Sequence, residues 1–394
     1  MLAVLAVSVW VQTAPPQTAP RPRASEPLTF ASDVRMIRLD VSVVDGSGRP
    51  VRGLVPQNFS LFEDGKRVEL SVFEAVEDGA TATSEPAGMG PQMSLSVRAE
   101  APPSRTQRQR IVVVADPFGL TAMQLARVRE ATSDFIAHQT KDGDLIRLIN
   151  LSTHEVWEGL IPVDRARLTS IARVISRHKN PLFKAGGDGD SIAEQIDFDM
   201  EADVSEAYSQ SLRSERFLSQ FSRTGELLGL FEEILVQLAA MPGRKSLIFI
   251  SAGFPQVRLL DERLERTAHL AREAQAAIHF IDAFGLDGLL PEGSGQKMRP
   301  IFEEAWERSG GSQDLAEATG GFVSRFANVL TGAVARAAEE ARSYYIVGYA
   351  PVRKDDGRFR TVKVRVNRDD VTVRTKKGYI AGGVGSGLVA KRVH

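Results

Sequence analysis

The chain has 394 residues, of which 43% are hydrophobic and 25% charged. These fractions are typical of soluble globular proteins and exclude a disordered, a collagen-like or a many-spanning membrane protein. Lysine and arginine (49) nearly balance aspartate and glutamate (50), so bulk charge favours neither nucleic acid nor an anionic membrane as partner. The absence of cysteine excludes disulfides, thiol nucleophiles and Cys-ligated metal sites. This length predicts about two or three domains.

Residues 1–32 are expected to be a signal peptide followed by a Pro-rich linker. Leu2 to Val11 is an apolar run interrupted only by Ser8. The run suits the hydrophobic region of a signal peptide and is too short to span a bilayer, which takes ~20 residues. No basic residue precedes it, and Pro follows both candidate cleavage residues, Ala14 and Ala19. We expect a secreted or periplasmic location; the alternative is a buried N-terminal strand or helix.

Residues 33–77 are predicted to form three or four short antiparallel strands. Apolar and polar residues alternate from Ile37 to Val43 and from Val68 to Val72, which is the period of half-buried strands. The Asp64-Gly65 pair before the second run supplies the positive φ of a tight hairpin. Residues 78–109 are typical of a linker, with one candidate strand at 94–98.

Residues 110–342 are predicted to be an α/β domain with a doubly wound, mostly parallel sheet flanked by helices. Buried strands are expected at 111–114, 145–149, 247–250 and 278–281. Helices are expected after a capping box at Thr121 and Gln124, after caps at Asp164 and Thr224, at 261–275 and at about 328–342.

Two segments interrupt this alternation. Residues 185–212 carry eight acidic residues and no basic one, and residues 285–299 are rich in Gly and Pro. Both are expected to be surface insertions near one edge of the sheet. The acidic segment could bind Ca²⁺, but Ile192 stands where an EF-hand needs a third oxygen ligand. A solvated acidic loop is therefore the favoured interpretation.

The two-residue period returns after residue 342. Strands are expected at 344–349, 362–366, 371–373 and 378–380. The strands at either end of the chain are too few for a sandwich by themselves, and together they would make one. The α/β domain is thus predicted to be inserted in a β-sandwich formed by residues 33–77 and 343–381. Residues 382–394 are expected to be a flexible tail.

Four stretches of the sequence are distinctive in their residues and in their order along the chain. They are VSVVDGSGRPVRGLVPQNFSLFEDGK (41–66), RIVVVADP (110–117), MPGRKSLIFISAGFP (241–255) and the segment 315–349, which continues through residue 381. With these motifs the chain resembles the von Willebrand factor A (VWA) related family of proteins common in Acidobacteria. The resemblance implies a VWA-type fold and an exported protein of unknown ligand, and VWA domains are generally binding modules.

The resemblance also implies a candidate metal site at the carboxyl edge of the sheet. Such a metal-ion-dependent adhesion site uses Asp-x-Ser-x-Ser after the first strand, a Thr, and an Asp after the fourth strand, all oxygen donors suited to Mg²⁺. The first block here reads Asp116-Pro117-Phe118-Gly119-Leu120. Both hydroxyls are therefore lost, and Ala252 replaces the second Asp.

Only Asp116 and Thr224 remain as weak candidate metal ligands. We predict a degenerate site with no cofactor, at which Mg²⁺ binding is disfavoured. Asp116 is instead expected to cap the first helix or to accept hydrogen bonds from loop amides.

The predicted function is an exported, non-catalytic binding or adhesion module whose ligand is a protein of unknown identity. Neither nucleic acid nor a membrane span is expected. The ligand is expected to contact rim residues Asp116, Pro117, Phe118, Gly119, Leu120, Thr224, Ser251, Gly253 and Phe254. The alternative is a metal-dependent hydrolase or other α/β enzyme that uses the same rim, although no Gly-x-Ser-x-Gly or His-Glu-x-x-His motif is present.

Overall fold

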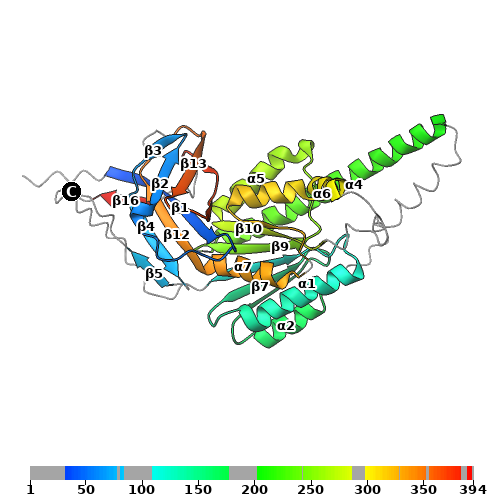
Figure 1. Cartoon of the computed structure of the whole chain (residues 1–394), viewed down its shortest axis with the longest axis horizontal. Coiled ribbons are helices and arrows are strands. Elements are labelled where there is room, and N and C mark those ends of the chain that lie inside the picture. Colours follow the sequence, from blue (N-terminus) through cyan, green and yellow to red (C-terminus); the bar gives the residue numbers. More distant parts are fainter. Residues whose placement is uncertain are drawn as a thin grey trace, which may run out of the picture.

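A computed structural model describes residues 32–77, 80–83, 109–176, 202–241, 243–285, 298–327, 329–351, 355–382 and 388–392. The predicted α/β class is confirmed, because a mostly parallel central sheet is flanked by helices (Figure 1). Strands from both ends of the chain lie beside this α/β part. Within the described ranges, no helix is both long and apolar enough to cross a bilayer.

The central sheet has the strand order β11-β10-β9-β6-β7-β8. Its strands are β6 (Arg110–Ala115), β7 (Leu145–Asn150), β8 (Glu155–Leu160), β9 (Lys245–Ser251), β10 (Ala276–Asp282) and β11 (Val323–Ser324). Neighbouring strands are parallel except β7 and β8. Every residue of β9 and β10 is buried, which is typical of parallel strands covered on both faces.

Alternate residues of these strands contribute to two apolar cores, one on each face. On one face Ile111, Val113 and Ile248 pack with α1 (Ala122–Asp134), its continuation η2 (Phe135–Gln139), α2 (Arg165–Arg173) and α7 (Thr331–Arg342). On the other face Val112, Val114 and Phe249 pack with α4 (Ala202–Ala239), α5 (Asp261–Glu273) and α6 (Met298–Thr319). The period-2 geometry of each strand thus divides its side chains between the two helical layers.

The sequence predicted the start of α1 correctly and that of α4 wrongly. The Thr121 amide donates to Gln124 Oε1 at 2.8 Å and the Gln124 amide to Thr121 Oγ1 at 3.2 Å, so the capping box is present. Asp164 precedes α2 but makes no side-chain cap bond. Thr224 caps nothing, because it lies inside the 38-residue α4.

Several segments expected to lack regular structure are helical or extended. Residues 202–212 of the acidic segment belong to α4, and the rest of that segment lies outside the described residues. The helix α6 was not predicted, nor was β8. The linker contains β5 (Ala80–Thr83), while the candidate strand at 94–98 lies outside the described residues. The expected flexible tail contains β16 (Leu388–Arg392), which pairs with the beginning of β1 (Ser32–Asp45).

The strands from the two ends of the chain form two antiparallel sheets. The first sheet has the strand order β14-β1-β12-β4-β5, and β16 also pairs with β1. In addition to β5 and β16, it consists of β1 (Ser32–Asp45), β4 (Val72–Glu77), β12 (Ser343–Tyr349) and β14 (Val371–Arg374). The second sheet has the strand order β15-β13-β2-β3. It consists of β15 (Gly378–Ile380), β13 (Phe359–Val366), β2 (Phe59–Glu63) and β3 (Lys66–Val68). The short helix η1 (Pro56–Asn58) directly precedes β2.

Residues from both sheets share one apolar core. Leu39 of β1 and Val347 of β12 are buried in it, together with Leu61 of β2 and Val364 of β13. Each sheet therefore combines strands from before and after the α/β part, and neither end of the chain builds this core by itself.

Candidate functional site

Polar side chains gather at the carboxyl edge of the central sheet. Asp116 directly follows β6, Ser251 ends β9 and Asp282 ends β10. Because these strands are parallel neighbours, their carboxyl ends meet at one edge. The amino edge faces the terminal strands, since Arg244 before β9 donates to Ser42 Oγ of β1 at 3.0 Å. The carboxyl edge is therefore directed away from those strands (Figure 1).

Asp116 is buried at this edge, with 2% of its surface exposed, and accepts hydrogen bonds on both oxygens. Ser251 Oγ donates to Oδ2 at 2.8 Å, and the Phe118 amide donates to Oδ1 at 3.3 Å. The Arg223 guanidinium of α4 forms an ion pair with the same carboxylate. The guanidinium also lies 4.3 Å from the centroid of the Phe118 ring. A cation from the chain itself thus neutralises Asp116.

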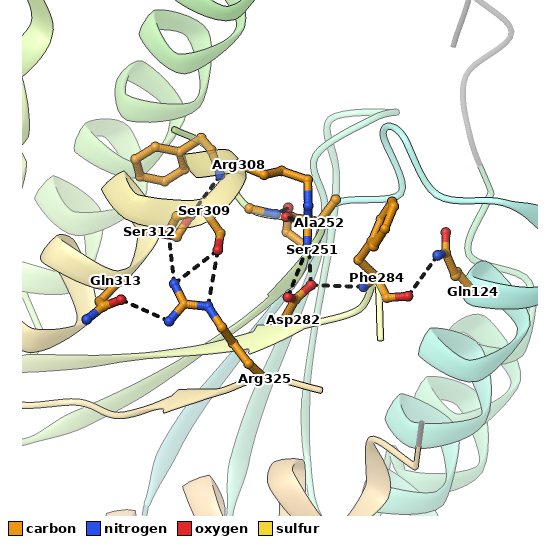
Figure 2. Close-up of polar contacts among 12 residues, drawn as sticks. Gln124, Ser251, Ala252, Asp282, Phe284, Arg308, Ser309, Ser312, Gln313 and Arg325 are labelled. Carbon is orange, nitrogen blue, oxygen red and sulfur yellow. Dashed lines mark hydrogen bonds and ion pairs between the residues drawn. The ribbon is translucent and has the colours of Figure 1, made fainter. Parts of the chain in front are cut away.

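Asp282 has the same kind of environment, supplied by α6. Arg308 Nη2 lies 3.1 Å from Asp282 Oδ2, and Nη1 of the same side chain donates to the Ala252 carbonyl (Figure 2). The Phe284 amide donates to Asp282 Oδ1 at 3.0 Å, and the Arg308 guanidinium lies 4.1 Å from the Phe284 ring centroid. Each aspartate is therefore paired with an arginine that stacks on a phenylalanine two residues after that aspartate.

A third arginine, Arg325, follows β11 at the same edge. Its Nη2 and Nε donate to Ser309 Oγ at 3.0 and 3.2 Å, and Nη1 donates to Gln313 Oε1 at 2.9 Å (Figure 2). The guanidinium lies 4.4 Å from the ring of Trp306, which is 49% exposed. We call Arg223, Arg308 and Arg325, with Phe118, Phe284 and Trp306, the arginine–aromatic rim.

The structure divides the predicted rim residues into two groups. Phe118, Gly119 and Gly253 are at least partly accessible, whereas Asp116, Pro117, Leu120, Thr224, Ser251 and Phe254 are buried. Leu120 packs in one sheet core and Phe254 in the other, so neither belongs to an accessible surface. The expectation that Asp116 accepts bonds from loop amides is confirmed by its contact with the Phe118 amide.

Two of the predicted rim residues, Gly253 and Thr224, lie in closely packed surroundings. Gly253 has φ of +89°, its amide donates to Ser251 Oγ at 2.9 Å, and a Cβ there would lie 2.6 Å from Ser309 Cβ. Thr224 follows Arg223 on α4 and is 2% exposed. Its hydroxyl has no hydrogen-bond partner in the described part of the chain.

Sequence reasoning missed Asp282 and the three arginines. Asp282 could have been found, because it directly follows the predicted strand 278–281 just as Asp116 follows 111–114. Arg308 lies on α6, which was not predicted. Within the described ranges, no group of three or more His, Asp or Glu side chains is placed to hold a metal ion.

No family model matches the chain, and no curated protein matches it. Among solved structures, the chain is similar to the TFIIH p34 N-terminal domain, with 13% sequence identity and a TM-score of 0.25. The alignment covers 58% of this chain and 95% of that chain. A likeness at this level does not assign the chain to a family.

Proposed function

We propose that the chain is an exported VWA-type binding module that recognises a protein partner at the arginine–aromatic rim without a metal ion. The observation that carries the proposal is the ion pair of Arg223 with Asp116, the carboxylate that would anchor a metal ion in a VWA domain. In this proposal the α/β part is inserted in a single β-sandwich, which the shared core of the two terminal sheets supports.

The contacts of Asp116 argue against Mg²⁺ at this position. A small divalent cation needs about six oxygens in near-octahedral geometry. Ser251 and Arg223 already donate to the two Asp116 oxygens, and a cation there would meet the positive guanidinium. Ala252, after β9, has no carboxylate to balance a second charge. The rim is thus a degenerate adhesion site in which arginine has taken the place of the ion.

The accessible side chains of the rim suit a protein partner. Arginine and aromatic residues dominate the energetics of protein interfaces, because they offer large contact areas and directed polar groups. The rim combines three arginines with the half-exposed Trp306. We expect the complementary segment of the partner to be acidic and aromatic.

The helix α4 extends this surface. It projects beyond the body of the α/β part (Figure 1). Phe217 and Leu218 on this helix are 46% and 62% exposed, and Phe217 stacks on Phe221 with ring centroids 6.3 Å apart. Exposed apolar groups beside polar ones mark interaction surfaces. A partner on the rim can therefore also contact α4.

The proposal is tested by capture of envelope-fraction proteins on the immobilised full chain, in Mg²⁺ and in EDTA. We expect the same partner under both conditions and about tenfold less of it with Trp306→Ser, since an aromatic hot spot contributes roughly 1.4 kcal/mol or more. Val163→Ser is the matched control, because Val163 is 82% exposed and follows β8 at the opposite edge of the sheet. It should leave capture unchanged.

Calorimetric titration with Mg²⁺ and Mn²⁺ provides the second arm. We expect no stoichiometric heat. A stoichiometric signal that disappears in Asp116→Ala, or capture that needs Mg²⁺, would replace the metal-independent proposal with a metal-dependent one. Export is tested separately by the cellular location and N-terminal sequence of the native protein; an uncleaved cytosolic chain would refute it.

A further inference from the structure

A cavity lies at the opposite end of the α/β part, between its amino edge and the terminal strands. Its volume is about 40 Å³. One water needs roughly 10–15 Å³ on this measure, so the space suits a small ion with a few oxygens. Four basic side chains and one acidic side chain line it, namely Arg38, Arg244, Arg272, Lys376 and Asp40.

These residues come from both parts of the molecule. Arg38 and Asp40 lie on β1, and Lys376 follows β14. Arg244 precedes β9, and Arg272 lies in the last turn of α5. The end of α6 closes the cavity, where a Cβ on Gly320 would lie 2.9 Å from the Thr375 carbonyl carbon. A ligand in the cavity would therefore touch both parts at once.

Acidic side chains balance only part of the positive charge of this cavity. Arg38 pairs with Glu74 at 3.1 Å. Arg244 donates to Ser42 Oγ and stacks on Tyr344 at 4.4 Å, and neither contact brings a negative charge. In the part of the chain that the structure describes, no ion pair includes Lys376, Arg272 or Asp40. Asp40 supplies the single carboxylate in the lining of the cavity.

Two further observations favour an anion as the ligand of this cavity. Arg244 is 9% exposed, and its Nη1 is buried without a hydrogen-bond partner among the described residues. Burial also lowers the pKa values of Lys376 and Arg272 from their ordinary values, against the opposing effects of Asp40 on Lys376 and of Glu265 and Glu273 on Arg272. Cations that are held in a poorly solvated site with only partial counter-charge favour an anion that binds there.

We propose that this cavity binds a phosphate group, as inorganic phosphate or a small phosphomonoester, which bridges the α/β part and the terminal strands. The cationic side chains would donate to its oxygens. Asp40 favours an oxyanion that carries a proton, because a carboxylate repels a fully deprotonated oxyanion but accepts a hydrogen bond from a protonated phosphate oxygen. Inorganic phosphate keeps such a proton at neutral pH, whereas a phosphomonoester, whose second pKa is about 6, carries it only in its minor monoanionic form. Sulfate carries no such proton at neutral pH and should bind much more weakly.

The test is calorimetric titration of the full chain with inorganic phosphate, glycerol 3-phosphate and sulfate at constant ionic strength. We expect saturable binding of the phosphates, and sulfate binding weaker by about tenfold or more, as for loss of a charge-assisted hydrogen bond. Tighter binding of the ester identifies a phosphomonoester as the ligand; the reverse identifies free phosphate.

Lys376→Met should weaken phosphate binding by about tenfold or more. Lys377→Met is the matched control, because Lys377 is exposed, pairs with Glu317 at 3.3 Å and does not line the cavity. Asp40→Asn should abolish the preference for phosphate over sulfate, and it provides a second variant if Lys376→Met fails to fold.

Three results would overturn the proposal. The first is the absence of saturable heat with both phosphates. The second is equal binding of phosphate and sulfate. The third is equal affinity of the Lys376→Met and Lys377→Met variants, which would mean that the cations only complement the carboxyl ends of nearby helices.

Discussion

Replacing Arg223 by methionine should destabilise the α/β part, because the Asp116 carboxylate then stays buried without its cation. The side chain of Asp116 is 3% exposed and that of Arg223 is 20% exposed. Among the described residues, the variant retains two donors to the carboxylate, Ser251 Oγ at 2.8 Å and the Phe118 amide at 3.3 Å. Methionine preserves most of the apolar stem, so the change removes charge more than packing.

The size of the effect follows from this partial burial. Removing one partner of a fully buried ion pair costs about 3–5 kcal/mol, and an exposed pair contributes about 0–1 kcal/mol. Two neutral donors remain on Asp116, and the Arg223 guanidinium is partly in water. We expect a loss of about 2–3 kcal/mol, of which stacking on Phe118 supplies about 0.5–1 kcal/mol.

Urea unfolding followed by tryptophan fluorescence measures this loss. Trp157 in β8 and Trp306 in α6 both report on the α/β part. Urea is preferred to guanidinium chloride because it does not screen ion pairs. The double variant Asp116→Asn with Arg223→Met should recover a large part of the loss, because no unpaired charge remains.

Arg263→Met is the control for loss of an arginine from this region. Arg263 pairs with Glu232 at 3.3 Å, but its side chain is 37% exposed, so its loss should cost less than about 1 kcal/mol. If Arg223→Met costs no more than Arg263→Met, or if the double variant is as unstable as the single one, Arg223 does not neutralise Asp116 as described.

Three further predictions concern stability. Arg342→Met should lower the free energy of unfolding, measured in urea, by about 3–5 kcal/mol, because Arg342 and Asp144 pair at 2.5 Å with side chains only 6% and 5% exposed. An effect below about 1 kcal/mol, as for an exposed pair, would contradict this prediction. Gly253→Ala should lower the free energy of unfolding by about 2 kcal/mol or more, since φ at this position is +89° and Ser309 leaves no room for a Cβ. An unchanged urea midpoint would show that the surrounding residues move to accommodate the Cβ. Burial lowers the pKa of Lys245 to about 8, below its ordinary 10.5, so the folded state binds fewer protons than the unfolded state between these values. The stability of the native protein relative to the Lys245→Met variant should therefore rise with pH from about 8 to 10.5, by roughly 3 kcal/mol at most. A difference in urea midpoint between the two proteins that does not change with pH would refute this prediction.

The sheet could be predicted from the sequence because local patterns determine it. The apolar runs at 111–114, 247–250 and 278–281 lie within β6, β9 and β10, where helices exclude water from both faces. The helix α6 could not be predicted in this way, because Pro300 and Gly310-Gly311 disfavour helix. Packing overrides propensity at Gly311, where a Cβ would lie 2.6 Å from the Pro255 carbonyl.

Sequence reasoning identified Asp116, Phe118 and Ser251 of this site but none of its arginines. Asp116 was identified because it matches the first Asp of the adhesion-site pattern, directly after a buried strand. Its partner Arg223 is 107 positions away in the sequence, and the contact depends on how α4 crosses the sheet edge. The start of α4 was itself misplaced, because Thr224 fits the pattern of a helix cap although the helix begins at Ala202. Contacts of this kind depend on tertiary packing, which cannot be predicted from the hydrophobic periodicity of the sequence.

The pairing of β1 with β12 has a mechanical consequence. The α/β part passes directly into β12, because α7 ends at Arg342 and β12 begins at Ser343. β1 begins at Ser32 and runs antiparallel to β12, with Ile37 to Val41 in register with Tyr349 to Tyr345. Tension between Ser32 and a partner held at the rim would pull both strands by their amino ends, and so load their hydrogen bonds in shear. All registered pairs would then share the force, whereas unzipping breaks such bonds one at a time.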